Sequence, residues 1–164
     1  MAISLAPAKT THASRWANVK TPYFVEVEID LADATTAKGS ALAANDIIEA
    51  LYVPANTLVL HAGVAVKSAM TGSSTDATID LGVTGNDPDR FVDGMDLDAA
   101  TAGTYGTVAA ASTSPALQIG ATGDTIDILI ATQTGTITGG VLRVFAVMVD
   151  TSDAVSAGIA QLGS

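Results

Sequence analysis

The sequence has no cysteine and is poor in both aromatic and charged residues. Aromatic residues make up 4% of its 164 positions, and charged residues make up 15%. The lack of cysteine excludes disulfide bonds, zinc sites built from thiolates and cysteine nucleophiles. No stretch approaches the roughly 18 consecutive apolar residues of a membrane helix, and the first residues lack the features of a secretory signal. We therefore expect no membrane partner and no export through a Sec signal.

Basic residues are also scarce, since seven lysines and arginines stand against 17 acidic residues. The formal net charge of −10 should repel the phosphate backbone, so we expect no nucleic-acid partner. The frequent residues are instead small or β-branched, and β-branched side chains favour strands. A surface with so few charges suits a protein that is covered by copies of itself or by a partner.

Residues 1–22 differ in charge from the rest of the chain. They contain three of the seven basic residues, and the first acidic residue is Glu26. Two prolines interrupt any regular period, which leaves either a frayed terminus or an extended arm that docks on a neighbouring subunit. The only tryptophan favours the arm, because tryptophan and arginine are common anchors of interfaces. The residues expected to make this interface are Lys9, Arg15, Trp16 and Lys20.

From Tyr23 onward, apolar and polar residues alternate at the period of a half-buried strand. Residues 57–70 form one long expected strand, in which the even-numbered residues from Leu58 to Met70 should face inward. Gly63 should introduce a bend in that strand. Two further strands, residues 75–83 and 125–133, show the same alternation. Their expected inward side chains are Ala77, Ile79, Leu81, Val83, Ile126, Ile128 and Ile130.

The remaining signals complete an all-β fold. Residues 140–150 are apolar on both faces except at Arg143, which indicates a central strand. Residues 34–45 are expected to form a loop of small residues that can include a helical turn. Seven or eight strands and little helix predict an antiparallel β-sandwich, jelly-roll-like in type. The predicted organisation is an extended N-terminal arm at 1–22, a sandwich body at 23–150 and a C-terminal tail at 151–164.

Residues 85–98, GNDPDRFVDGMDLD, contain five aspartates within a dozen positions. An EF-hand counted from the first aspartate fails, because Phe91 and Val92 occupy the positions that require an oxygen ligand and a glycine. A less regular calcium site remains open, and its expected ligands are Asp87, Asp89, Asp93 and Asp96. The interpretation that we favour is a long connection between strands, kept solvated by aspartate and attached to the core by Phe91, Val92 and Leu97.

No arrangement of residues indicates catalysis. The only histidines, His12 and His61, belong to the arm and to a strand, and no G-x-S-x-G nucleophile elbow accompanies them. With 14 aspartates, some pair at the separation of glycosidase carboxylates is inevitable, so such a pair has no diagnostic value. We therefore predict that the protein is not an enzyme, and that it has no cofactor unless the aspartates bind Ca²⁺.

Several segments resemble structural proteins of tailed bacteriophages, especially those of aquatic hosts. The shared features are the turn VPANTLVL, the strand ATIDLGVTG and the stretch DPDRFVDGMDLDAA that follows it. The closing pair of strands, TIDILIATQTGTITGGVLRVFAVMVD, is similar to the end of the same proteins. The resemblance covers about residues 23 to 150 and includes no catalytic signature.

The resemblance implies a virion protein, of the small capsid decoration or cement type. Such proteins are commonly β-rich, form homotrimers and clamp the major capsid protein from outside. The implied location is the capsid exterior of a virion, after synthesis in the cytoplasm of a bacterial host. The alternative is an adhesion module of a tail or fibre that recognises glycans on the host surface, with calcium at the aspartate cluster.

Overall fold

The computed structural model describes residues 2–4, 21–106 and 116–152. Most of the predicted arm and most of the predicted tail therefore lie outside the described residues. The strands are β1 (Ala2–Ser4), β2 (Tyr23–Asp30), β3 (Ile47–Val53), β4 (Thr57–Gly72), β5 (Asp76–Val83), β6 (Asp87–Asp96), β7 (Leu117–Gln118), β8 (Asp124–Thr134) and β9 (Ile137–Asp150), and the helix is α1 (Leu31–Lys38).

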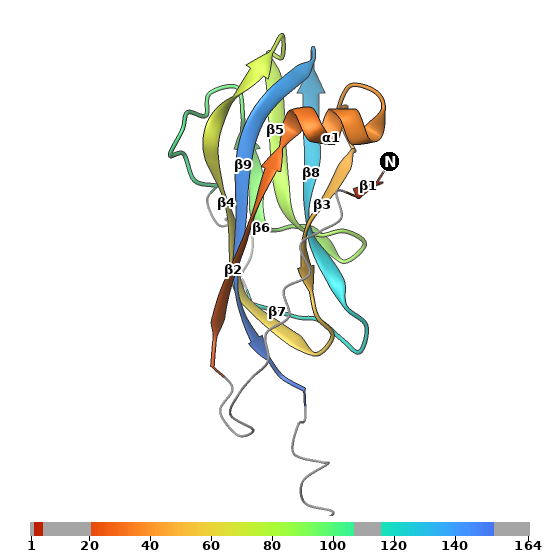
Figure 1. The fold of residues 1–164 in the computed structure, drawn as a ribbon, viewed down its shortest axis with the longest axis vertical. Helices are drawn as coiled ribbons and strands as arrows, with labels where there is room; N and C mark the ends of the chain where they lie inside the picture. Colours follow the sequence, from red (N-terminus) through yellow and green to blue (C-terminus); the bar gives the residue numbers. More distant parts are fainter. Residues whose placement is uncertain (1, 5–20, 107–115, 153–164) are drawn as a thin grey trace, which may run out of the picture.

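The strands form two sheets that pack face to face (Figure 1). Sheet A has the order β1-β3-β8-β5-β6, and sheet B has the order β2-β9-β4-β7. All pairs are antiparallel except that of β1 with β3. The predicted all-β antiparallel sandwich is confirmed, and β9 is a central strand between β2 and β4, as its apolar character indicated.

The eight strands from β2 to β9 pair in a nested order. The first pairs with the last, β2 with β9, and the pairing continues inward through β3 with β8 and β4 with β7 to the hairpin of β5 with β6. The body is therefore one long hairpin folded over into two layers, which agrees with a jelly-roll-like arrangement. No helix in the described part of the chain is long and apolar enough to cross a membrane.

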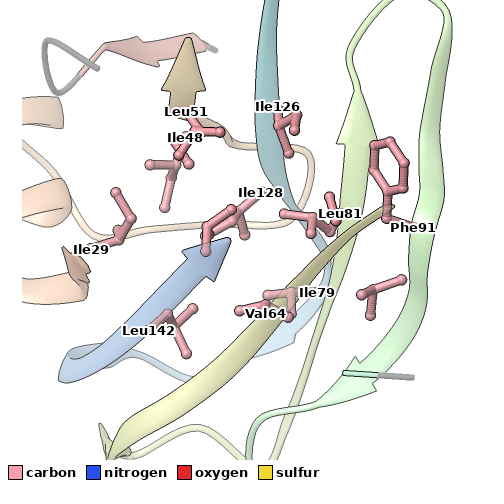
Figure 2. Close-up of a cluster of buried hydrophobic side chains, with 14 of the residues drawn as sticks. Ile29, Ile48, Leu51, Val64, Ile79, Leu81, Phe91, Ile126, Ile128 and Leu142 are labelled. Carbon is pink, nitrogen blue, oxygen red and sulfur yellow. The ribbon is translucent and has the colours of Figure 1, made fainter. Parts of the chain in front are cut away.

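The core lies between the sheets and is built from the inward faces that the alternation predicted. Figure 2 shows side chains of β5 and β8 meeting those of β4 and β9. Ile79, Leu81, Ile126, Ile128 and Ile130 are completely buried. Each such isoleucine or leucine contributes roughly 1.5–3 kcal/mol by leaving water.

The predicted alternation in β4 is wrong at the start of the strand. Val59 is completely buried, whereas Leu58 and Leu60 are only half-buried, and Ala62 and Val64 are buried again. The cause is a register shift against β9 between Val59 and His61, which inserts one extra residue and reverses the faces.

Gly63 does not mark that irregularity, because its pairing with Phe145 is regular. A Cβ atom on Gly63 would lie 2.7 Å from Cζ of the Phe145 ring. The glycine therefore makes room for the aromatic ring that covers it, rather than bending the strand.

The helix α1 lies over the end of the core; it begins at Leu31 and takes in residues 34–38 of the expected loop. The Asp30 carboxylate caps its N-terminus by accepting from the Ala32 N–H at 2.8 Å. Gly39, with φ 74°, ends it in the left-handed conformation. Leu31 and Ala34 are completely buried, so packing against the sandwich stabilises this short helix despite its threonines.

Candidate functional site

The four residues predicted to form the interface of the arm lie outside the described residues. Lys9, Arg15, Trp16 and Lys20 therefore remain predictions. Residues 2–4 are described, and they form β1, which adds a short parallel strand to the edge of β3. The described residues continue from Thr21, which lies just before β2 in the sequence.

The aspartate-rich segment is a strand, β6, rather than the long connection that we expected. It pairs with β5 at the edge of sheet A, with register shifts on either side of Leu81. The register shifts interrupt the alternation of buried and exposed residues, and aspartates occupy many positions. The sequence pattern therefore did not indicate a strand here. The predicted attachment to the core is confirmed, because Phe91, Val92 and Leu97 are at most 2% exposed.

Several of the aspartates hold the backbone around β6. Asp96 Oδ1 accepts from the N–H groups of Asp98 at 2.8 Å and Ala99 at 3.1 Å, which shapes the turn after the strand. Asp98 accepts from the N–H of Ala77 on the neighbouring strand. Asp87 pairs with Arg90, Oδ2 to NH1, at 3.0 Å. These contacts give the aspartates a structural role. The sequence alone did not distinguish this role from metal binding.

Asp89 lies among like charges. A hydrogen bond with Asp87 is the main cause that raises its pKa, and slight burial and the charge of Asp93 act in the same direction. In the described part of the chain, no three acidic or histidine side chains are grouped so that they could hold a metal ion. Calcium binding by Asp87, Asp89, Asp93 and Asp96 remains a prediction.

The position of β6 suggests a second use for its charges. An exposed edge strand presents unpaired backbone groups that can recruit another strand, and charged residues, proline and bulges prevent this. β6 combines carboxylates, Pro88 and two register shifts at one edge of sheet A. Its aspartates therefore protect the edge against pairing as well as keeping it solvated.

The outer face of sheet A is acidic. Glu49 of β3 and Asp127 of β8 are direct partners across the strands, and Asp80 of β5 lies on the same face. Asp127 is 4% exposed, and its Oδ2 accepts from the N–H of Thr84 at 3.2 Å. Burial raises the pKa of Asp127, and the charge of Glu49 adds to this, while hydrogen bonds from Thr84 and Thr125 oppose it.

The outer face of sheet B carries aromatic side chains instead. We call Phe24, His61, Phe145 and Val147 the aromatic surface. The Phe24 and Phe145 rings are stacked with centroids 6.0 Å apart, and His61 tilts against Phe145 at 6.3 Å. Val147 is the cross-strand partner of both Phe24 and His61, so the four residues are contiguous. Phe24 is 56% exposed, and His61 is half-buried on this outer face.

Two ion pairs border the aromatic surface. Glu28 pairs with Lys67, and Glu26 pairs with Arg143 at 3.7 Å between Oε2 and NH1. All four side chains are substantially exposed, so the pairs contribute little to stability. Their effect is to offset the acidic charge of β2 next to an apolar patch, which makes this face less repulsive to a partner than the face of sheet A.

Sequence reasoning missed the aromatic surface. It recognised the alternation that starts at Tyr23 but did not place Phe24 on the outer face of β2. The alternation of the strand could have predicted this position, because Phe24 is next to the buried Val25 and must therefore face outward. The contact with Phe145 could not be found in this way, because it depends on the pairing of β2 with β9.

Comparisons with known proteins give a likeness in structure alone. No family model and no curated protein matches the sequence. A chain in the capsid of Ralstonia phage GP4 is similar over 93% of this chain and 100% of its own length, with 21% identity and a TM-score of 0.62. A chain of the capsid asymmetric unit of cyanophage Pam1 is similar over 87% and 93%, with 12% identity and a TM-score of 0.60. The chain thus has a fold that also occurs in the capsids of phages.

Proposed function

We propose that this protein is a non-enzymatic structural component of a phage virion, which decorates and stabilises the outside of the capsid. The observation that carries the proposal is the extent of the structural likeness, 93% of this chain and 100% of a chain in a phage capsid. The similarity therefore concerns a whole capsid chain rather than one domain within a larger protein. The resemblance of residues 23 to 150 to phage structural proteins points in the same direction.

The surface of the molecule fits a role in contact rather than chemistry. The described residues place a contiguous aromatic surface on one outer face and carboxylates with structural partners at one edge. In the proposed role the protein requires no cofactor. Neither similar structure is described as a tail or fibre, so nothing favours the alternative of glycan adhesion.

The proposed mechanism is multivalent attachment. Each copy in a homotrimer contributes a modest contact to the major capsid protein, and linkage of the copies raises the overall avidity by orders of magnitude. The N-terminal arm, with Lys9, Arg15, Trp16 and Lys20, is the proposed anchor. Its positive charge complements an acidic partner surface, which favours encounter and correct orientation.

The test is attachment to capsids from the source phage, followed by cryo-EM localisation of the chain. Regularly spaced copies on the capsid exterior are expected, and density confined to the tail would refute the decoration role. Attachment should be lost when residues 1–20 are deleted. Because that deletion also removes β1, a second variant should keep the first eight residues and carry Lys9→Glu, Arg15→Glu, Trp16→Ala and Lys20→Glu.

A further inference from the structure

The two large hydrophobic side chains that are strongly exposed in the described part of the chain lie on the same face of the molecule. They are Phe24, which is 56% exposed, and Tyr105, which is 57% exposed. Phe24 belongs to the aromatic surface. Tyr105 forms a bridge with Ala65 of β4, and Ala65 is the cross-strand partner of Arg143 on β9. Because cross-strand partners point to the same side of a sheet, Tyr105 extends the outer face of sheet B beyond β4.

The charges on this face balance, although the whole protein has a formal net charge of −10. Each glutamate of the two ion pairs that border the aromatic surface has a basic partner. The other two basic residues in the described part of the chain lie elsewhere, since Lys38 is buried against Asp46 and Arg90 pairs with Asp87 of β6. Two copies can therefore approach each other through the outer face of sheet B with less repulsion than through the acidic face of sheet A.

The two signs of charge occupy different strands of sheet B. Glu26 and Glu28 are on β2, on one side of β9, whereas Lys67 is on β4, on the other side (Figure 1). Such a face is complementary to itself after a half-turn about an axis that runs along β9, because β2 of each copy then lies over β4 of the other. A half-turn about an axis across the strands would instead place β2 over β2 and bring glutamates together.

The aromatic residues fit the same half-turn. Phe24 and His61 are both cross-strand partners of Val147, one on each side of it. The axis along β9 therefore places Phe24 of each copy opposite His61 of the other, and Phe145 of β9 opposite its own counterpart. Aromatic rings would form the centre of this contact and the ion pairs its border, which is the usual arrangement of an apolar core and a polar rim.

The size of the face limits the strength of the contact. From β2 to Tyr105 it spans three strand spacings, or about 14 Å, and from Phe24 to Asp30 it spans about 20 Å along the strand. An interface of these dimensions lies at the low end for specific contacts between proteins, so we expect a weak association, detectable at concentrations of about 100 µM.

We propose that the outer face of sheet B binds the same face of a second copy about a two-fold axis along β9, with Phe24 of each copy against His61 of the other and Glu28 of each copy near Lys67 of the other. A two-fold contact uses each face once and joins two copies only. It is therefore separate from the homotrimer of the proposed function, does not rest on it and requires no capsid.

The first experiment measures self-association of the full-length chain by sedimentation velocity, at protein concentrations from about 5 to about 500 µM. The mass of the wild type should rise with concentration. Phe24→Ser should associate at least about tenfold more weakly, because the two-fold contact contains this anchor twice. Circular dichroism melts verify that the variant is folded.

Charge reversal tests the direction of the axis. Glu28→Lys and Lys67→Glu should each weaken self-association, because like charges then face each other between the copies. An equimolar mixture of the two variants should associate more strongly than either alone, since one copy then has basic side chains at both positions and the other has acidic side chains at both. The matched control is Asp93→Lys, which makes the same change of charge on β6 of sheet A. Its mixture with Lys67→Glu should show no such recovery.

Each measurement has an outcome that overturns the inference. A wild type whose mass stays constant over the whole range overturns it, and so does association that Phe24→Ser leaves unchanged. A mixture of Glu28→Lys with Lys67→Glu that associates no better than the control mixture also overturns it. If the wild type does not self-associate and Phe24→Ser abolishes attachment to capsids, the face belongs to the capsid contact instead. Capsid attachment of the wild type is measured separately, so the decoration role can fail while this contact holds.

Discussion

The two outer faces of the sandwich share one construction and differ in what they present to water. Both are made by residues that alternate with a buried core, but the face of sheet A carries Glu49 and Asp80 beside the buried Asp127, whereas the face of sheet B carries stacked rings and offset charges. Alternation determines only which side of a strand is buried. The outward residues are not determined by the alternation, so a difference between them can indicate a function. This difference directs the search for a partner-binding surface to sheet B.

The largest expected difference between the faces comes from two glycines that look equivalent in the sequence. A Cβ on Gly82 of sheet A would overlap the carbonyl oxygen of Asp87, which is backbone and cannot move aside. The Cβ of Gly63 would meet the tip of the Phe145 ring at 2.7 Å, and that ring can tilt. We expect Gly82→Ala to lower the free energy of unfolding by about 3 kcal/mol, and Gly63→Ala by about 1 kcal/mol. Urea denaturation measures both, and equal losses would contradict the assignment.

A second pair of substitutions separates structural from solvating aspartates at the edge of sheet A. Asp96 accepts two backbone N–H groups, so Asp96→Ala should cost about 1–2 kcal/mol. Asp93 is exposed, and Asp93→Ala should change stability by less than about 0.5 kcal/mol. Thermal melts with and without Ca²⁺ provide the control. A large calcium-dependent rise in melting temperature that disappears in both variants would restore the metal interpretation.

Asp127 gives the face of sheet A a dependence on pH. Burial raises its pKa in the folded protein, so folding favours the protonated form. Stability from this group is fully present below the unfolded pKa of about 3.9 and is lost as the pH rises through the folded pKa. Asp127→Asn should therefore raise the melting temperature at pH 7, and this gain should vanish near pH 3. A gain that is equal at both pH values would show that charge is not the cause.

The smallest expected effect concerns the ion pairs of sheet B. Lys67→Gln and Arg143→Gln should each reduce stability by no more than about 0.5 kcal/mol, because the pairs are exposed. That small loss should shrink further in 1 M salt, where the screening length is about 3 Å. Chemical denaturation at two salt concentrations measures both losses.

Much of the body could be predicted because the apolar residues of several strands recur with a period of two. The inward faces of β5 and β8 follow directly from Ile79, Leu81, Ile126 and Ile128. The failures occurred where tertiary contacts override local pattern. The extra residue at Leu60 is visible only in the pairing with β9, and α1 forms because Leu31 and Ala34 complete the core.

The candidate site was less accessible to sequence reasoning than the fold. Residues such as Phe24 and Phe145 come from opposite ends of the chain and meet only through strand pairing. The aspartates of β6 were conspicuous, but their number concealed which of them bind backbone groups. A cluster of one residue type identifies a segment, whereas the role of each member depends on its neighbours in space.

The nested pairing of the strands also has a consequence for synthesis. β2 leaves the ribosome first among the body strands, yet its only partner among the described residues is β9, over a hundred residues later in the sequence. β9 also completes the long pairing with β4. Sheet B therefore cannot close until translation is almost finished, and contacts this distant in sequence form slowly. During that interval Phe24 and its strand lack the pairing with β9, so crowded nascent chains depend on the acidic charge of the body to stay apart.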